Sequence, residues 1–224
     1  MVDNLAHVDA ELAQRVAAPL GIDPPNAAAA AARRGFRKAP FAVDVQPSPA
    51  LSMATSVDGS IATRCVAILV ADGVDGIAVD AVKQTVMTAG AQCKVVAAAL
   101  GSVATASGAR LAVDCTFGNT PSIAFDAVFL PALGGAPLTT HGDAVHFVLE
   151  AYKHCKAIAA AGSGAALLGS QGVSMPTEAG VTQPLGGVVL CGAGQLPGDF
   201  AAAFIGAIGQ HRHWSRSNVD AVPA

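Results

Sequence analysis

The stretch KAIAAAGSGAALL, residues 156–168, decides the fold class of this chain. An apolar run leads into the turn Gly162-Ser163-Gly164, and a second apolar run follows it. A central parallel strand that continues into a helix has this form, because a buried strand is apolar throughout and its exit turn is made of small residues. In an α/β sheet such a turn lies at the carboxyl edge of the strands, where ligands and nucleophiles are placed. The turn is therefore the first place to look for chemistry.

This turn lacks an obvious nucleophile. In an α/β enzyme with a nucleophile elbow, Ser or Cys occupies the strained apex, where backbone N–H groups stabilise negative charge. The apex here is Gly162, which has no side chain. Ser163 is the only hydroxyl of the turn, and no His or Asp is placed by motif to activate it. We interpret Ser163 as the N-cap of the helix expected to follow, with a nucleophilic role as the weaker alternative.

Strands and helices alternate on both sides of this stretch. Continuous apolar runs predict strands, and 3.6-residue periodicity predicts helices. The predicted strands cover 65–70, 93–98, 127–130, 157–161 and 188–191; the predicted helices cover 79–88, 143–154 and 197–211, with a hairpin insertion within 103–117. This alternation predicts an α/β domain with a mainly parallel sheet that is covered on both faces.

The first 63 residues differ in character from the rest. Residues 4–20 place apolar side chains at helical spacing, which predicts one amphipathic helix packed through Leu5, Val8, Leu12, Val16 and Leu20. Residues 26–60 show no sustained period and contain several prolines, which indicates an extended linker. We therefore expect the end of one domain over 1–22, a linker over 23–63 and a complete second domain over 64–224.

Composition excludes several classes of function. Hydrophobic residues make up 52 % of the 224 residues, charged residues 13 %, and the net charge is -3. A nucleic-acid surface needs a clustered basic face, whereas the one basic cluster, residues 33–38, is interpreted as a solvated linker. No stretch has the ~20 continuous apolar residues that span a bilayer. We expect no nucleic-acid or membrane partner and a cytoplasmic location, and the five widely spaced cysteines suit a reducing compartment.

Other candidate sites are weak. The glycine pairs of 134–135 and 192–194 follow strands but complete no phosphate-binding motif, so no nucleotide is expected. Asp72 and Asp75 follow the first strand of the second domain, where entry into a helix is the expected role. Tyr152 lacks the surrounding residues that a haem ligand needs. The scattered histidines show no metal-binding spacing and are expected at the surface or as caps: His141, His146, His154, His211 and His213.

Several stretches together resemble the C-terminal portion of large-subunit monofunctional haem catalases. They are LAHVDAELAQRVAAPLGIDPP, SPALSM, RCVAILVADGVD, FDAVFLPALGG, EAYKHCKAIAAAGSG and the ending HRHWSR followed by VPA. The resemblance implies that residues 1–22 end the catalase helical domain and that residues 64–224 form an appended flavodoxin-like, doubly wound domain. It also implies a longer parent, with haem held by a barrel that this chain lacks.

The appended domain is similar in turn to the DJ-1/PfpI and class I glutamine amidotransferase group. The elbow of that group reads A-x-C-H-G, which places its Cys at Gly162, its His at Ser163 and its last Gly at Gly164. The partner acid of the group falls at about Ala78. Because Cys, His and acid are all replaced, the resemblance implies a degenerate elbow with no catalytic, cofactor-binding or metal-binding residue.

These expectations combine into one functional hypothesis. The parent would disproportionate hydrogen peroxide as a haem-containing homotetramer, while this domain would be non-catalytic. Its role would be to stabilise the parent, contact the catalase core and neighbouring subunits, or hold unfolded client proteins in the manner of a chaperone. The alternative is a free-standing DJ-1/PfpI-like enzyme, a hydrolase or glyoxalase with an atypical site.

Overall fold

The chain divides into two units, Met1–Leu51 and Ser52–Ala224, in the computed structural model. The structure describes residues 2–6, 8–23, 59–134, 138–171, 180–192, 194, 196–216, 219 and 222. The basic cluster at 33–38 and most of the predicted linker lie outside these residues. The domain boundaries expected at 22/23 and 63/64 remain predictions.

The first unit contains short helices. They are α1 (Val2–Leu5), α2 (Ala10–Ala17) and the 3-10 helix η1 (Ala18–Leu20). The prediction of one helix over 4–20 is wrong because Asp9 begins a new helix: its side chain accepts a hydrogen bond from the Leu12 backbone N–H at 2.9 Å. Of the predicted packing residues, Leu5 and Val16 contact the small core that Ala13 and Ala17 form in this unit. Val8, Leu12 and Leu20 are instead 80 %, 43 % and 62 % exposed.

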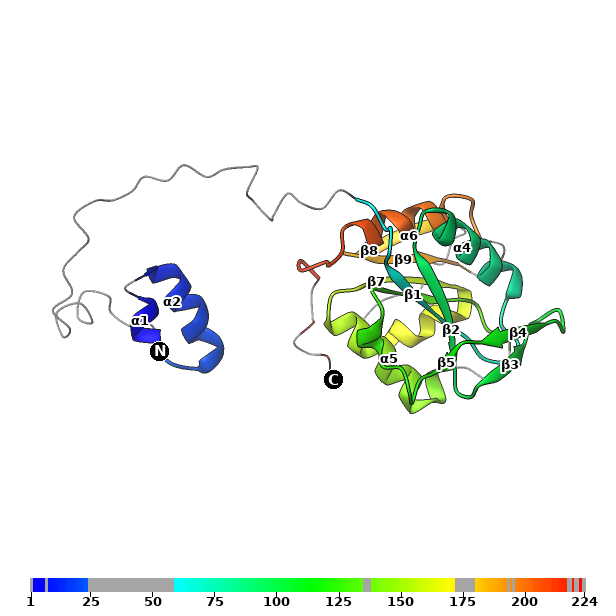
Figure 1. Ribbon diagram of the computed structural model, residues 1–224, viewed down its shortest axis with the longest axis horizontal. Coiled ribbons are helices and arrows are strands. Elements are labelled where there is room, and N and C mark those ends of the chain that lie inside the picture. The colour runs from blue at the N-terminus through cyan, green and yellow to red at the C-terminus, as the bar shows by residue number, and fades with distance from the viewer. Residues whose placement is uncertain are drawn as a thin grey trace. The chain divides into compact units, whose positions relative to one another are not determined.

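The second unit is built on a seven-stranded sheet with the order β5-β2-β1-β6-β7-β9-β8 (Figure 1). Its strands are β1 (Cys65–Leu69), β2 (Gln92–Ala97), β5 (Cys115–Thr116), β6 (Ala127–Leu130), β7 (Ala157–Ala161), β8 (Val181–Leu185) and β9 (Val188–Cys191). All neighbours are parallel except β8 and β9, which are antiparallel. The strand order reverses between β1 and β6, as in a doubly wound sheet. The predicted α/β, flavodoxin-like fold is confirmed.

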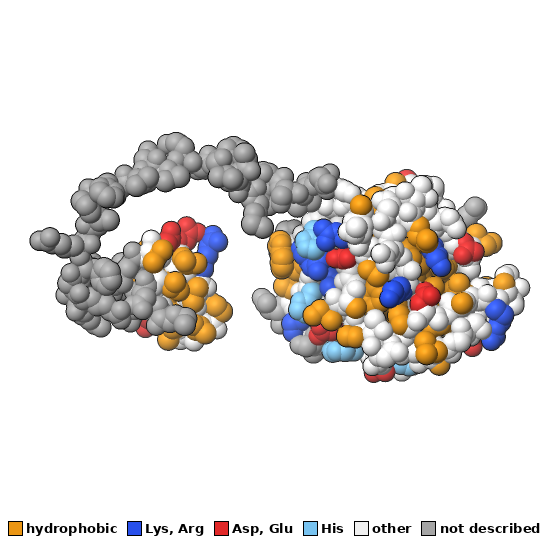
Figure 2. Space-filling model, viewed as in Figure 1, with side chains coloured by type: hydrophobic (Ala, Val, Ile, Leu, Met, Phe, Trp, Pro, Cys, Tyr) orange, Lys and Arg blue, Asp and Glu red, His pale blue; other side chains and the backbone are white. Residues whose placement is uncertain are grey.

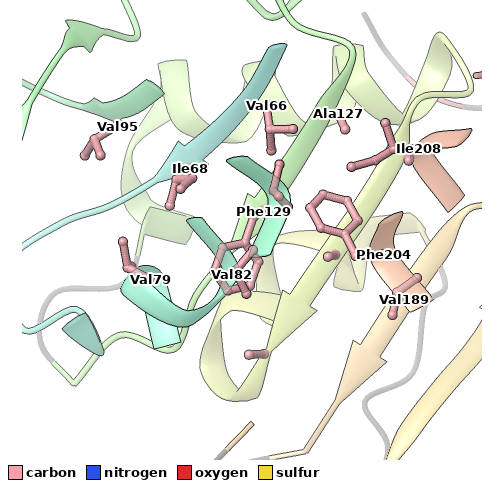
Figure 3. Close-up of a cluster of buried hydrophobic side chains, with 14 of the residues drawn as sticks. Val66, Ile68, Val79, Val82, Val95, Ala127, Phe129, Val189, Phe204 and Ile208 are labelled. Atoms are coloured by element: carbon pink, nitrogen blue, oxygen red, sulfur yellow. The ribbon is translucent and has the colours of Figure 1, made fainter. Parts of the chain in front are cut away.

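Helices cover both faces of this sheet (Figure 1). One core cluster joins α4 (Gly76–Thr88) and α6 (Phe200–Gly209) to the face that carries Phe129 (Figure 3). The other cluster joins α5 (Gly142–Lys153) to the opposite face. The central strands β6 and β7 are buried at every position, which explains why their sequences are continuously apolar rather than alternating.

Smaller elements connect the strands of the sheet. The predicted hairpin insertion consists of β3 (Gly101–Ala104) and β4 (Arg110–Val113), which form a separate antiparallel pair. Three 3-10 helices complete the unit: η4 (Ser122–Ala124), η5 (Leu138–Thr140) and η6 (Gly162–Gln171). The segment after β7 was expected to be an α-helix, and the structure shows the tighter η6 there instead.

Close approach of η6 to strand β6 depends on Gly164. A Cβ atom at this position would meet the backbone oxygens of Leu130 and Pro131, and backbone oxygens cannot move aside as a flexible side chain can. Gly169, in the same 3-10 helix, has no atom within 4 Å of an added Cβ. The small residue at 164 is therefore required by packing, whereas the one at 169 is not.

Gly164→Ala should destabilise the second unit by about 2 to 4 kcal/mol, because the added methyl group forces η6 away from β6. The measurement is urea unfolding followed by far-ultraviolet circular dichroism. Gly169→Ala is the matched control and should stay within about 1 kcal/mol of the original chain. Equal stability of the two variants would contradict this packing argument.

Candidate functional site

The turn after β7 retains the backbone of an elbow. Gly162 directly follows Ala161, the last residue of β7, and has a φ angle of 49°, in the left-handed region that glycine tolerates. A nucleophile elbow likewise holds its apex residue in a strained conformation. The left-handed conformation remains at the predicted apex, and the residue there has no side chain.

Ser163 fastens the turn to the loop after β6. Its hydroxyl accepts a hydrogen bond from the Leu133 backbone N–H at 2.8 Å and donates one to the Leu133 carbonyl at 2.9 Å. The predicted N-cap role is wrong, because Ser163 lies within η6 and its hydroxyl is used by Leu133. The cavity beside it measures about 20 Å³ and is lined by Leu133, Leu138, Thr139, Ser163 and Leu167. Such a volume holds about one water molecule and no substrate.

The thiol nearest the apex belongs to Cys191, at the end of β9. Residues Ala161 and Cys191 are paired across β7 and β9, and the Gly162 backbone hydrogen-bonds the thiol. Burial raises the pKa of Cys191 to about 11, and the hydrogen bond from Gly162 offsets only part of that increase. The reactive form of cysteine is the thiolate, so Cys191 is a protonated, inert group at neutral pH.

The position of the family acid, Ala78, lies in the first turn of α4 and is buried. Its backbone N–H donates to the Asp75 carboxylate at 3.1 Å, so Asp75 is the N-cap of α4, in agreement with the helix-entry role expected for it. Asp72 accepts from the Ala104 backbone N–H at 2.8 Å and fastens the β3–β4 hairpin. Both carboxylates near the elbow therefore have structural partners.

Two larger cavities border this edge. One of about 440 Å³ lies beside the start of α4, and Asp75 is the one charged side chain among the described residues that line it. Another, of about 360 Å³, lies over the ends of β1 and β2 and includes Asp72 and His141. His141 is itself a cap, since its Nδ1 accepts from the Ala144 backbone N–H at 3.4 Å. The polar groups of these cavities thus serve the fold.

The glycine turns and histidines build no ligand site in the described part of the chain. The Gly134 N–H already donates to the Gly73 carbonyl at 2.8 Å; Gly135 and Ala193 lie outside the described residues. His154 pairs with Glu150 at 3.2 Å. His213 is buried, and its Nε2 contacts the Ala207 carbonyl in the last turn of α6, which agrees with the capping role expected as the alternative to a surface position. No group of three or more metal-ligating side chains occurs among the described residues.

Sequence reasoning missed the most heavily bonded buried side chain, Arg216. Its guanidinium donates to the carbonyl oxygens of Gly186 at 3.0 Å, Tyr152 at 3.0 Å and Lys156 at 2.6 Å. It also lies 4.8 Å from the centroid of the Tyr152 ring. Burial lowers the pKa of Arg216, yet an arginine stays charged in proteins. One cation therefore joins the end of α5, the start of β7 and the turn before β9.

Lys156 is the second buried cation. Its Nζ donates to the Ser122 carbonyl at 2.6 Å and lies 3.4 Å from the Ser122 hydroxyl. Burial lowers the pKa of Lys156 to about 8, and the charge of Arg212 adds to that effect. The Ser122 carbonyl also accepts from the Phe125 N–H at 3.0 Å, so it keeps a donor if Lys156 is removed.

Tyr152 does not fit a haem. Its side chain is fully buried and its ring packs against the Arg216 guanidinium. Burial raises the pKa of the Tyr152 phenol, whereas a tyrosine that ligates haem iron is best as the phenolate. None of the described cavities is lined by Tyr152. The described residues therefore offer haem no tyrosine ligand.

Arg216→Met should destabilise the second unit by roughly 3 kcal/mol, because the buried carbonyls of Tyr152 and Lys156 and the part-buried carbonyl of Gly186 lose a charged donor. Urea unfolding measures the effect. Arg212→Met is the matched control on the same turn and should cost about 1 kcal/mol or less, since Arg212 hydrogen-bonds His211 at a part-buried position. Similar losses for the two variants would contradict the role given to Arg216.

Lys156→Met should raise stability at pH 7 by on the order of 2 kcal/mol, because the folded state disfavours the buried charge. The unfolded chain keeps its proton up to the ordinary lysine pKa of 10.5, whereas the folded chain releases it near 8. The contribution of Lys156 to the stability of the original chain should therefore rise between about pH 8 and 10.5. Burial raises the pKa of Cys93 and of Cys191 to about 11, so these thiols lower the stability of the original chain and of the variant alike at high pH. The difference in stability between the original chain and the variant should narrow over that range.

Urea unfolding at several pH values tests this linkage. Lys94→Met, at an exposed lysine of β2, is the control and should keep the pH dependence of the original chain. A Lys156→Met variant whose stability runs parallel to that of the original chain from pH 7 to pH 10 would refute the assignment.

The comparison with solved structures shows the fold. A two-domain protein with dj-1/thij/pfpi-like and ferritin-like domains from Anabaena variabilis matches with a TM-score of 0.56 and 20 % identity, covering 72 % of this chain and 52 % of that one. Drosophila melanogaster DJ-1beta matches with a TM-score of 0.54 and 16 % identity, covering 71 % and 95 %. The DJ-1/ThiJ/PfpI-like fold predicted for the appended domain is thereby confirmed.

The comparison with known sequences gives the family. Catalase HPII of Mycobacterium avium is 39 % identical over all of this chain, which spans 31 % of that protein. Catalase HPII of Pseudomonas aeruginosa is 36 % identical over 92 % of the chain, which spans 28 % of it. The chain thus spans less than a third of the length of these relatives. Residues 62–218 match the model of the C-terminal domain found in long catalases, and the chain belongs to that family.

Proposed function

We propose that this domain is non-catalytic and stabilises a long catalase polypeptide, through contacts with the catalase core and neighbouring subunits. The observation that carries the proposal is the elbow, where Gly162 keeps a φ angle of 49° but supplies no nucleophile. Ser163 is bonded to Leu133, and the adjoining space of about 20 Å³ excludes a substrate.

In the parent, peroxide disproportionation would belong to the core, which would hold the haem. The relatives are named catalases, and this chain corresponds to less than a third of each. No described helix is long and apolar enough to cross a membrane. We expect the parent to be a cytoplasmic homotetramer and this domain to lie outside its chemistry. The alternative of a free-standing DJ-1/PfpI-like hydrolase or glyoxalase would need a catalytic thiolate, which the protonated Cys191 does not supply.

A chaperone-like role is the second candidate, and exposed apolar side chains favour it. In the first unit Val8, Leu12, Leu20 and Ile22 are 80 %, 43 %, 62 % and 48 % exposed. Helices that expose large apolar residues bind partners or aggregate. In the parent these side chains would pack against the core, and in a separated domain they would be free to hold unfolded chains or to self-associate.

Removing residues 64–224 from the parent should leave the rate of peroxide breakdown per haem within about twofold, while the half-life at elevated temperature falls about tenfold. The reason is that the contacts of this domain would stabilise the folded assembly but not the unfolded chain, and would not take part in the reaction. Oxygen evolution and residual activity after heating measure the two effects.

The 224-residue chain supplies the controls. By itself it should show no Soret band, no peroxide breakdown and no thiol-dependent turnover of methylglyoxal. Added to a heated client enzyme, it should reduce light scattering only if residues 1–63 are present. Unchanged heat resistance of the shortened parent, together with unchanged client aggregation, would contradict both the stabilising role and the chaperone-like role.

A further inference from the structure

The segment 211–216 presents Trp214, the only tryptophan of the chain, to solvent. Trp214 is 78 % exposed, while His213 and Arg216 on either side are 6 % and 4 % exposed. The His213 Nε2 lies 2.9 Å from the Ala207 carbonyl, and the His213 backbone N–H donates to the Cys155 carbonyl at 2.9 Å. Because both flanks are anchored, the backbone that carries the indole is fixed before any partner binds. Fixed aromatic side chains of this kind are preferred anchors of protein interfaces.

Backbone strain gathers around this segment. Among the described residues other than glycine, positive φ angles occur at Thr63, Cys155 and His211, with values of 67°, 54° and 65°. Thr63 precedes β1, Cys155 precedes β7 and His211 follows α6, so all three lie at the amino edge of the sheet. Such outliers persist where the surrounding structure fixes them, and they concentrate at functional sites.

Arginine and histidine side chains lie at the same edge. Arg64 pairs with Asp126 at 3.4 Å, and His211 and Arg212 follow α6 there. Figure 2 shows basic and histidine side chains side by side at one edge of the larger unit. Among the described residues, the Arg212 guanidinium bonds only within its own segment, to the His211 carbonyl at 3.0 Å and the His211 Nδ1 at 3.4 Å. It retains donors for a carboxylate.

The point at which the chain enters the second unit indicates the partner. Gly59 lies so close to Gly209 that a Cβ atom added to Gly209 would be 2.5 Å from the Gly59 carbonyl oxygen. The charge of Arg64 also helps to lower the pKa of His211. The chain therefore enters the second unit at the edge that also carries Arg212 and Trp214. Tethering gives two surfaces an effective concentration of roughly millimolar, enough for a small contact to form.

We propose that Trp214 and Arg212 dock into an apolar pocket with a carboxylate at its rim on the catalase core that precedes this domain in the long polypeptide. The inference rests on the proposed function and names the surface that would perform it. Ile77, which is equally exposed, lies in the first turn of α4 at the opposite edge of the sheet.

X-ray hydroxyl-radical footprinting of the full-length catalase and of the 224-residue chain tests this docking. Trp214 should be oxidised about fivefold more slowly in the full-length protein, because the core covers the indole. Ile77 has the same exposed fraction, 78 %, and serves as the internal control, whose oxidation rate should change by less than about twofold. Equal oxidation of Trp214 in both proteins would overturn the proposal.

Variants of the full-length protein give a second readout. Trp214→Ala should shorten the half-life of activity at elevated temperature about threefold, whereas Ile77→Ala should leave it unchanged. In the 224-residue chain, both substitutions should leave the melting temperature unchanged, since both side chains are exposed. If removal of residues 64–224 lowers heat resistance but Trp214 stays fully oxidisable, this surface is wrong and the proposed function stands. If that removal has no effect on heat resistance, both the docking surface and the proposed function are wrong.

Discussion

The buried guanidinium of Arg216 is the interaction on which the second unit most depends. It replaces the hydration lost on burial with three carbonyl oxygens, supplied by a helix end, a strand start and a turn. These groups are distant in sequence, 60 and 64 residues from Arg216 in two cases. An apolar side chain would hold them by shape alone, whereas a guanidinium also fixes the direction from which each carbonyl approaches. The C-terminal segment is therefore a structural part of the sheet.

The position of the positive charges follows from the topology. Each helix returns from the carboxyl edge of the sheet to the amino edge, so α4, α5 and α6 all direct their C-terminal carbonyls toward the same edge. Helix C-termini carry partial negative charge, which favours cations nearby. Lys156 and Arg216 follow this rule inside the protein, and Arg212 follows it in a partly exposed position. The fold thus tolerates buried cations that are bonded mainly to carbonyls. The partial negative charge at the C-terminus of α6 likewise favours Arg212 at this edge, where its guanidinium can bind a partner.

Local pattern sufficed for most of the sheet and failed wherever a contact was distant in sequence. Continuous apolar runs located β1, β6, β7 and β9, because burial on both faces leaves no alternation to misread, and the buried second half of β2 was enough to locate that strand. Two strands were missed. β8 lies in a Gly- and Pro-rich stretch, where tertiary pairing with β9 overrides local preference, and β5 was included in the predicted hairpin insertion although it pairs with β2 in the main sheet. Ser163 was misassigned because its partner, Leu133, is 30 residues away. The replacements at Gly162 and Ala78 were evident from the sequence, whereas the small cavity beside the elbow depends on packing that no local pattern encodes.

The edges of the sheet have a consequence for the assembly of several copies. An open sheet offers unpaired N–H and C=O groups at each margin, and a second molecule can extend it strand by strand into a polymer. Here one margin is β5, with two residues, and the other is β8, whose Pro184 has no N–H to donate. Many such domains can therefore be crowded around one oligomer, at high local concentration, while neither margin serves as a template for cross-β growth.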